Sequence, residues 1–309
     1  MILSVSRRTD IPGYYSQWFY NRIKEGFLYV KNPINPHQIS KLLLSPEVVD
    51  CIVFWTKNPG NMMAGLNQLR DFAYYFQFTL TCYGKDVEPN LPDKGQVLIP
   101  TFQRLSGEIG KERVIWRYDP IFLNERYTTE YHIRAFGKIA EQLCGCTQKV
   151  IISFVDFYAK TKRNAAHLNM RRPQGEELLR LAGALAHIAG ENGMIIETCA
   201  EEVELQSLGI CHGSCIDRRL IEKLTGYSIL GKKDGNQRKA CGCLESVDVG
   251  TYHTCPNGCK YCYANFSEKK VRENIQLYHP EASLLCGMVG EKDRMTQRMQ
   301  KSLIDRTHV

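Results

Sequence analysis

The chain has 309 residues, of which 43% are hydrophobic, and 40 Lys and Arg residues against 33 Asp and Glu give a formal charge of +7. This composition excludes a disordered tail and leaves enough apolar material for a large core. No stretch approaches the roughly 18 apolar residues of a membrane span, and charged residues follow the first few positions before a signal peptide can form. We therefore expect a cytoplasmic protein, whose 13 cysteines indicate metal or redox chemistry and not a disulfide framework.

The first two thirds of the chain alternate between short β-rich runs and longer amphipathic stretches, which is typical of parallel βα units. Six strands are predicted, at residues 2–6, 51–56, 75–81, 113–118, 149–155 and 194–198. Helical patterns lie between them, at residues 15–23, 133–143 and 178–188, each followed by a glycine where a helix would end. The sequence therefore predicts an α/β fold, a six-unit partial TIM-like barrel over residues 1–207.

Polar and charged side chains follow most of the predicted strands. In βα barrels, ligands and catalysis lie at the carboxyl ends of the strands, so these side chains are expected to meet on one rim. Ordinary turns and helix caps also place polar residues there, and that interpretation stays open for each position. The catalytic candidates are Arg117, Asp119 and Glu197, and the candidates for binding a cofactor or an anionic substrate are Arg7, Lys57 and Asp156.

The pattern changes after about residue 208. Eight of the 13 cysteines lie between Cys211 and Cys286, and the βα alternation fades. We predict that residues 208–309 form a cysteine-rich module that packs on the barrel domain. A polar helix is expected near its end, at residues 292–303.

The sharpest motif of this module is Cys255-Pro-Asn-Gly-Cys259-Lys-Tyr-Cys262. Three thiolates at this spacing can surround one small cluster, because a turn at Gly258 lets the chain double back. Three protein ligands on a 4Fe-4S cluster leave one iron open, as catalytic metal sites leave a position for their substrate.

CPNGCKYC resembles the CxxxCxφC motif of the radical S-adenosylmethionine superfamily, whose core is a six-unit βα barrel. The resemblance implies that Cys255, Cys259 and Cys262 ligate a 4Fe-4S cluster whose open iron binds S-adenosylmethionine, with Tyr261 near the adenine. Reduction by a donor such as flavodoxin or ferredoxin would cleave the cofactor to a 5′-deoxyadenosyl radical that abstracts hydrogen from a substrate. In that superfamily the motif normally follows the first strand, whereas here it lies near the C-terminus.

The chain as a whole resembles an uncharacterised bacterial family called domain of unknown function 1848. The resemblance runs from SVSRRTDIPGYY through VFWTKNP to CGCLESVDVGTYHTCPNGCKYCYAN and covers nearly the full length. It names no substrate, and we expect a small-molecule or nucleotide-type compound.

The remaining cysteines suggest a second site. Four of them suffice for an auxiliary four-thiolate cluster, and the preferred set is Cys199, Cys215, Cys241 and Cys243. The alternative is that cysteines outside the motif are buried free thiols, the role expected for Cys51, Cys82, Cys144 and Cys146.

A different class of protein stays open beside the enzyme. Cys241 or Cys243 is able to complete a closed zinc site with the motif, since thiolates bind zinc as well as iron. The chain would then be a non-catalytic zinc- or iron-sulfur-stabilised binding protein. Nucleic acid is its candidate ligand, through the basic residues Lys269, Lys270 and Arg272, which otherwise form a solvated helix face.

Overall fold

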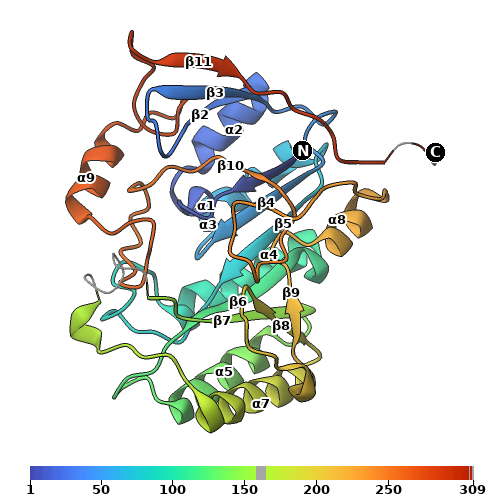
Figure 1. The fold of residues 1–309 in the computed structure, drawn as a ribbon, viewed down its shortest axis with the longest axis vertical. Coiled ribbons are helices and arrows are strands. Elements are labelled where there is room, and N and C mark those ends of the chain that lie inside the picture. Colours follow the sequence, from blue (N-terminus) through green and yellow to red (C-terminus); the bar gives the residue numbers. More distant parts are fainter. Residues whose placement is uncertain (158–164, 306, 308–309) are drawn as a thin grey trace.

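The computed structural model describes residues 1–157, 165–305 and 307, and its main feature is one eight-stranded parallel sheet (Figure 1). Each neighbouring pair of strands in this sheet is parallel. In spatial order the strands are β10 (Val247–Asp248), β1 (Ile2–Val5), β4 (Cys51–Thr56), β5 (Tyr74–Thr79), β6 (Val114–Ile121), β7 (Lys149–Phe154), β8 (Ile195–Cys199) and β9 (Cys211–Gly213).

The six predicted strands are confirmed as β1, β4, β5, β6, β7 and β8, and with them the α/β class. Two short strands from the cysteine-rich segment, β10 and β9, form the two edges of the sheet. Within the described residues these edges do not pair with each other, so the sheet is open and does not close into a TIM barrel.

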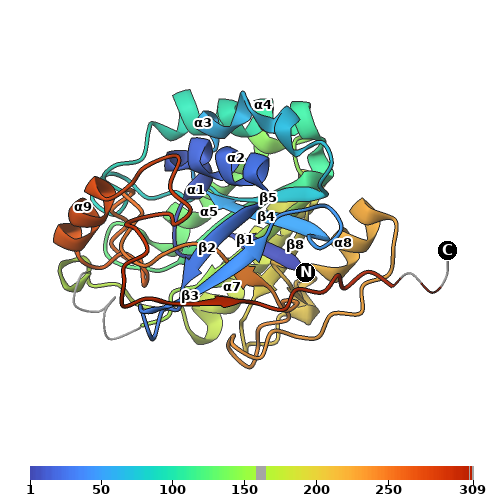
Figure 2. The ribbon, with the colours of Figure 1, turned by 90° about the horizontal axis from the view of Figure 1, so that it is seen from above.

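Helices connect the strands and cover one face of the sheet. In Figure 2, α2, α3 and α4 lie together on one side of β1, β4 and β5. The helices are α1 (Ile11–Tyr14), α2 (Ser16–Glu25), α3 (Gly60–Met63), α4 (Ile99–Ile109), α5 (Thr129–Leu143), α7 (Gly175–Glu191), α8 (Arg218–Thr225) and α9 (Glu268–Gln276), with short helical turns at Leu66–Leu69, Lys94–Leu98, Lys111–Arg113, Ala166–Leu168 and Gln206–Leu208. The three predicted helices are α2, α5 and α7, and α2 ends as expected at Gly26, whose φ is +77°.

The two faces of the sheet bury different parts of the chain, because successive strand residues point to opposite faces. On β4, Ile52 and Phe54 belong to the large core under the helices. Cys51 and Val53 face the other way and share a second core with residues such as Ile216 of the cysteine-rich segment. The sheet is therefore the middle of three layers, and the third layer brings cysteines to its second face.

A smaller sheet lies beside the large one, with β2 (Phe27–Lys31) antiparallel to β3 (Gln38–Leu43) and β11 (Arg294–Gln297) parallel to β3. The prediction of a helix at residues 292–303 is wrong, since β11 occupies this region. The edge of β3 supplies hydrogen-bond partners for the backbone of β11. Met295 and Met299 remain exposed, so this segment does not bury the apolar face that an amphipathic helix would need. The domain boundary at residue 207 stays a prediction, although β9 and β10 join the same sheet as β1.

None of the helices in the described ranges combines the length and the apolar character needed to cross a membrane.

Candidate metal centre

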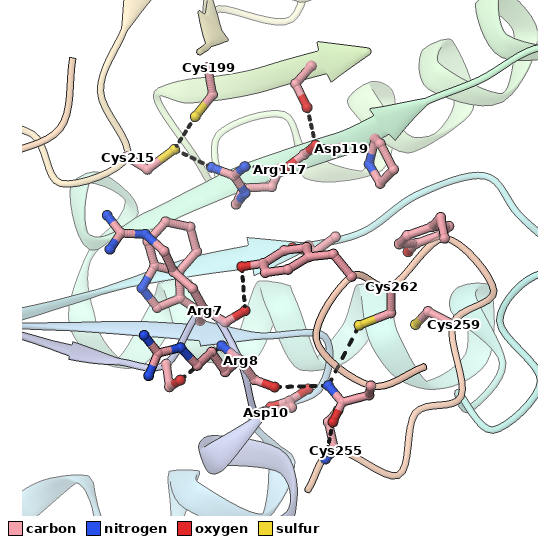
Figure 3. Close-up of a pocket in the computed structure, with 18 of the residues that line it drawn as sticks. Arg7, Arg8, Asp10, Arg117, Asp119, Cys199, Cys215, Cys255, Cys259 and Cys262 are labelled. Carbon is pink, nitrogen blue, oxygen red and sulfur yellow. Dashed lines mark hydrogen bonds and ion pairs between the residues drawn. The ribbon is translucent and has the colours of Figure 1, made fainter. Parts of the chain in front are cut away.

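A cavity of about 630 Å³ opens where the strands of the large sheet end. Its walls include residues at the carboxyl ends of β1, β4, β5, β6, β7 and β8, together with loops of the cysteine-rich segment. Figure 3 shows Cys199 and Cys215 beside Arg117, across the cavity from Cys255, Cys259 and Cys262. The two cysteine groups that the sequence singles out therefore face one shared space.

The CxxxCxxC loop enters the site from β10, which pairs in parallel with β1 through Leu3 opposite Val247 and Ser4 opposite Asp248. Asp248 holds this edge strand in place, because its carboxylate accepts hydrogen bonds from the end of β1. The donors are the Ser4 hydroxyl at 3.0 Å, the Ser6 hydroxyl at 2.7 Å and the backbone N–H of Arg7 at 2.8 Å. The motif is late in the sequence, yet it begins beside the first strand.

The three motif cysteines, Cys255, Cys259 and Cys262, all line the cavity. Burial raises the pKa of the Cys255 thiol and raises that of Cys259 to about 12. The expected turn is present at Gly258, whose φ is +70° and where a side chain would also meet Asn90 at 3.0 Å. The three cysteines are thus half-buried on one tight loop at the cavity wall.

Asn265 fixes the motif loop with both ends of its side-chain amide. Its Oδ1 accepts from the backbone N–H groups of Thr254 at 2.9 Å and Cys255 at 3.0 Å. Its Nδ2 donates to the carbonyl of Arg8 at 2.9 Å and to the sulfur of Cys262 at 3.6 Å. The CxxxCxxC motif does not include Asn265, and its position three residues after the last cysteine is the only signal that points to it.

Asp10 is the carboxylate nearest to the first motif cysteine, and burial raises its pKa. Both of its oxygens are already engaged. The donors are the Gly13 N–H at 3.0 Å, the Thr56 hydroxyl at 2.6 Å, the Lys57 N–H at 2.8 Å and the Asn257 amide at 3.1 Å. Asp10 therefore braces the strand ends and does not offer a free oxygen to a metal.

Tyr261 lines the cavity with its ring, while its hydroxyl donates to the buried carboxylate of Glu88. Glu88 also accepts from Lys57 at 2.7 Å, from Thr81 at 2.9 Å and from Lys94. Burial opposes the charge of Glu88, but the two lysines outweigh it and hold its pKa at about 2. Lys57 thus reaches the cavity as predicted, with its ammonium group committed to Glu88.

Arg7 and Arg117 both approach the ring of Trp55, with their guanidinium carbons 5.0 and 5.1 Å from its centre. Arg117 pairs with Asp119, which also accepts from the Ser153 hydroxyl. Burial opposes the charge of Asp119, but the Arg117 guanidinium lowers the pKa of this carboxyl below its usual value. This arrangement places two cations and an indole ring on the cavity wall.

The structure brings most of the predicted site residues together. Arg7, Lys57, Arg117, Asp119, Asp156 and Tyr261 line the cavity with the seven proposed ligand cysteines. Asp156 is paired with Arg238 and, at 3.4 Å, with Arg172. Glu197 is not among the lining residues, and it accepts from Lys149 at 2.9 Å, deeper along β8.

The other cysteines differ in burial. Cys51 and Cys82 are buried as expected, and burial raises the pKa of Cys82 to about 12. The prediction of a buried thiol is wrong for Cys144, which is exposed because it follows the last turn of α5, and Cys146 is only half-buried. The basic residues Lys269, Lys270 and Arg272 lie on α9 and outside the cavity lining, where Lys269 pairs with Glu273 at 3.9 Å.

The donor set consists of thiols, which bind both iron-sulfur clusters and zinc. In the ranges that the structure describes, no group of three or more His, Cys, Asp or Glu side chains is arranged to hold a metal ion. The three motif thiols line one open cavity, so their chemistry and placement are compatible with a cluster.

A comparison with protein families matches residues 2–264 to a family described as Domain of unknown function (DUF1848). Neither the curated proteins nor the solved structures contain a match to the chain.

Proposed function

The chain belongs to the DUF1848 family, and we propose that it is an iron-sulfur enzyme that uses S-adenosylmethionine for radical chemistry. One observation carries the proposal, namely that Cys255, Cys259 and Cys262 share the wall of a cavity at the strand ends. The nearby carboxylates of Asp10 and Glu88 are engaged by the protein, so they leave an open position to a fourth, exchangeable ligand.

The strand order supports the resemblance to the radical enzymes. Their motif normally follows the first strand, and in this chain it follows β10, which is first in the spatial order β10-β1-β4-β5-β6-β7-β8-β9. The order along the chain is therefore permuted while the position of the motif at the carboxyl edge of the sheet is retained. In this proposal, the open sheet is a partial barrel and the cysteine-rich segment is its iron-sulfur module.

Held by Cys255, Cys259 and Cys262, a reduced cluster of this kind would supply one electron to the sulfonium of S-adenosylmethionine, so that its C5′–S bond would break into methionine and a 5′-deoxyadenosyl radical. The chain's own residues would position the cofactor and keep water from the radical. Glu88 holds the hydroxyl of Tyr261, so that the ring of Tyr261 and not its polar end would be left to contact an adenine. Asp119, held by Arg117 and Ser153, offers carboxylate oxygens to ribose or substrate hydroxyls.

The cavity also suggests the charge of the substrate. Arg7 and Arg8 line it, and among the described residues neither forms an ion pair with a carboxylate. Arg7 Nη2 is buried without a hydrogen-bond partner in the same ranges. Because a buried guanidinium group needs a partner, we propose a small-molecule or nucleotide-type substrate that carries a carboxylate or a phosphate.

Anaerobic purification followed by reduction in the presence of S-adenosylmethionine tests the proposal. Dithionite, or a flavodoxin or ferredoxin as the natural type of donor, should support release of 5′-deoxyadenosine. The C259A variant should release none, because one of the three cluster ligands is gone. C286A is the matched control, since Cys286 belongs to the same C-terminal segment but is not a lining residue.

The alternative of a non-catalytic binding protein predicts the opposite result. Protein that carries zinc without iron or labile sulfide, or an iron-sulfur protein that never cleaves S-adenosylmethionine when reduced, would overturn the enzyme proposal. Salt-dependent binding of oligonucleotides that is lost in a K269A/K270A variant would then favour nucleic acid as the ligand.

A further inference from the structure

Four thiols outside the CxxxCxxC motif meet on the opposite wall of the cavity. Cys199 ends β8, Cys215 follows β9, and Cys241 and Cys243 lie in the loop before β10. The sulfurs of Cys199 and Cys215 are 2.8 Å apart, and Cys243 interacts with both Cys215 and Cys241, which lower the pKa of its thiol. All four residues are at most 9% exposed, and all four line the cavity.

This grouping differs from the ordinary packing of buried thiols. Cys51 lies in the same second core and shows the ordinary case, because its sulfur donates to the backbone oxygen of Ile52 at 3.8 Å. The four thiols instead come from three separate segments and contact one another in series. A buried cysteine can pack as a small apolar residue, but that role does not require four sulfurs to converge.

The positive charges of the site face these sulfurs. Arg117 Nη1 donates to the sulfur of Cys215, and the backbone N–H of Ile216 donates to the sulfur of Cys243 at 3.4 Å. Arg7 approaches the same Trp55 ring as Arg117. Four thiolates around a metal group carry net negative charge, and N–H donors and guanidinium groups beside the sulfurs stabilise that charge.

We propose that Cys199, Cys215, Cys241 and Cys243 bind a second iron-sulfur cluster, in which protein sulfurs occupy all four ligand positions. The open cavity beside these thiols leaves room for a cluster, and thiolates are the ligands that iron-sulfur clusters take. The proposed function does not depend on this site, since the motif cluster lies on the other wall.

The second cluster is tested in a protein that cannot form the first. The C255A/C259A/C262A variant, loaded anaerobically with ferrous iron and sulfide, should retain about four iron and four sulfide per chain. Dithionite reduction should give an electron paramagnetic resonance signal. Adding C215S to this variant should abolish the bound iron and sulfide and also the resonance signal. Adding C211S should leave the bound cluster and its signal unchanged, because Cys211 is exposed and outside the cavity lining.

The reciprocal variant separates the two proposals. C199S/C215S/C241S/C243S should keep about four iron per chain, bound by the motif. If the motif triple variant folds by circular dichroism but binds no iron, or holds one zinc ion without sulfide, the second site is refuted while the motif cluster stands. If only the reciprocal variant lacks iron, the second site stands and the proposed function fails.

Discussion

At the scale of single residues, Asn265 has the most interactions with the motif loop, because it satisfies two backbone N–H groups at the start of the motif. Asn265→Ala leaves these buried donors unpaired, which costs about 1–3 kcal/mol each. Urea unfolding of cluster-free protein should show this loss. Iron affinity should also fall roughly 10- to 100-fold, as for other residues that orient metal ligands.

Asn265→Asp is the matched variant, because it keeps the acceptor oxygen and loses the donor to Arg8 and Cys262. It should unfold close to the wild-type urea concentration and still bind iron less tightly. Wild-type stability and wild-type iron affinity in the alanine variant would contradict the role given to Asn265.

Glu88 predicts a dependence of stability on pH. Its carboxyl has a folded-state pKa of about 2 against an ordinary value of 4.5, so the stabilisation is present above pH 4.5 and is lost as the pH falls towards 2. Glu88→Gln leaves Lys57 and Lys94 unpaired and should lower the free energy of unfolding at pH 7 by about 3–5 kcal/mol. The difference from wild type should shrink between pH 4.5 and 2.

Urea unfolding of both proteins at pH 7, 4.5 and 3 measures this effect. Glu176→Gln, on the exposed side of α7, is the control and should match wild type at each pH. A constant difference between Glu88→Gln and wild type across this range would show that the lysines do not shift the Glu88 carboxyl.

Single residues also show where prediction from sequence succeeded. Arg7, Lys57 and Arg117 were predicted at the cavity because they follow or end buried strands, and the structure places them there. The role of Asp248 depends on partners more than 240 residues away in the chain, so local pattern gives no sign of it.

At the scale of elements, β10 is the strand that positions the motif, and it has only two residues. Such a strand carries no alternation of apolar and polar side chains, so the sequence pattern could not predict it. The longer strands were predictable because they are runs rich in β-branched and aromatic residues, and the helices α2, α5 and α7 because each repeats apolar residues at three- and four-residue spacing.

Asp248 connects β10 to β1, and replacing it should release the edge strand. Asp248→Ala should speed hydrogen exchange in residues 247–254 while β4 exchanges as in wild type, since β4 pairs with β1 and β5 and not with β10. The iron content of the Asp248→Ala protein should also fall. Equal protection of residues 247–254 in the variant and wild type would show that the carboxylate does not hold the strand.

At the scale of the whole molecule, the sheet separates two cores of different character. The large core under the helices contains none of the seven proposed ligand cysteines, whereas the second core contains Cys199, Cys215, Cys241 and Cys243. We therefore expect the helical layer to fold without metal. The cysteine-rich layer is expected to depend on metal for its fold.

Removal of iron by a chelator under reducing conditions should then lower the melting temperature while most of the far-ultraviolet circular dichroism remains, because ligands that bind only the native state stabilise it. Thermal melts of loaded and stripped protein measure both effects. Complete loss of the dichroism on stripping, or an unchanged melting temperature, would contradict this division between the two layers.

The late position of the motif has a consequence for biosynthesis. All eight strands of the large sheet precede Cys255 in the chain, so the ribosome releases the three motif sulfurs after every strand of that sheet has been made. A cell that matures this protein would deliver iron and sulfide to a nearly finished scaffold and not to a nascent peptide. The motif loop would then close around a cluster that is inserted after the scaffold has been translated.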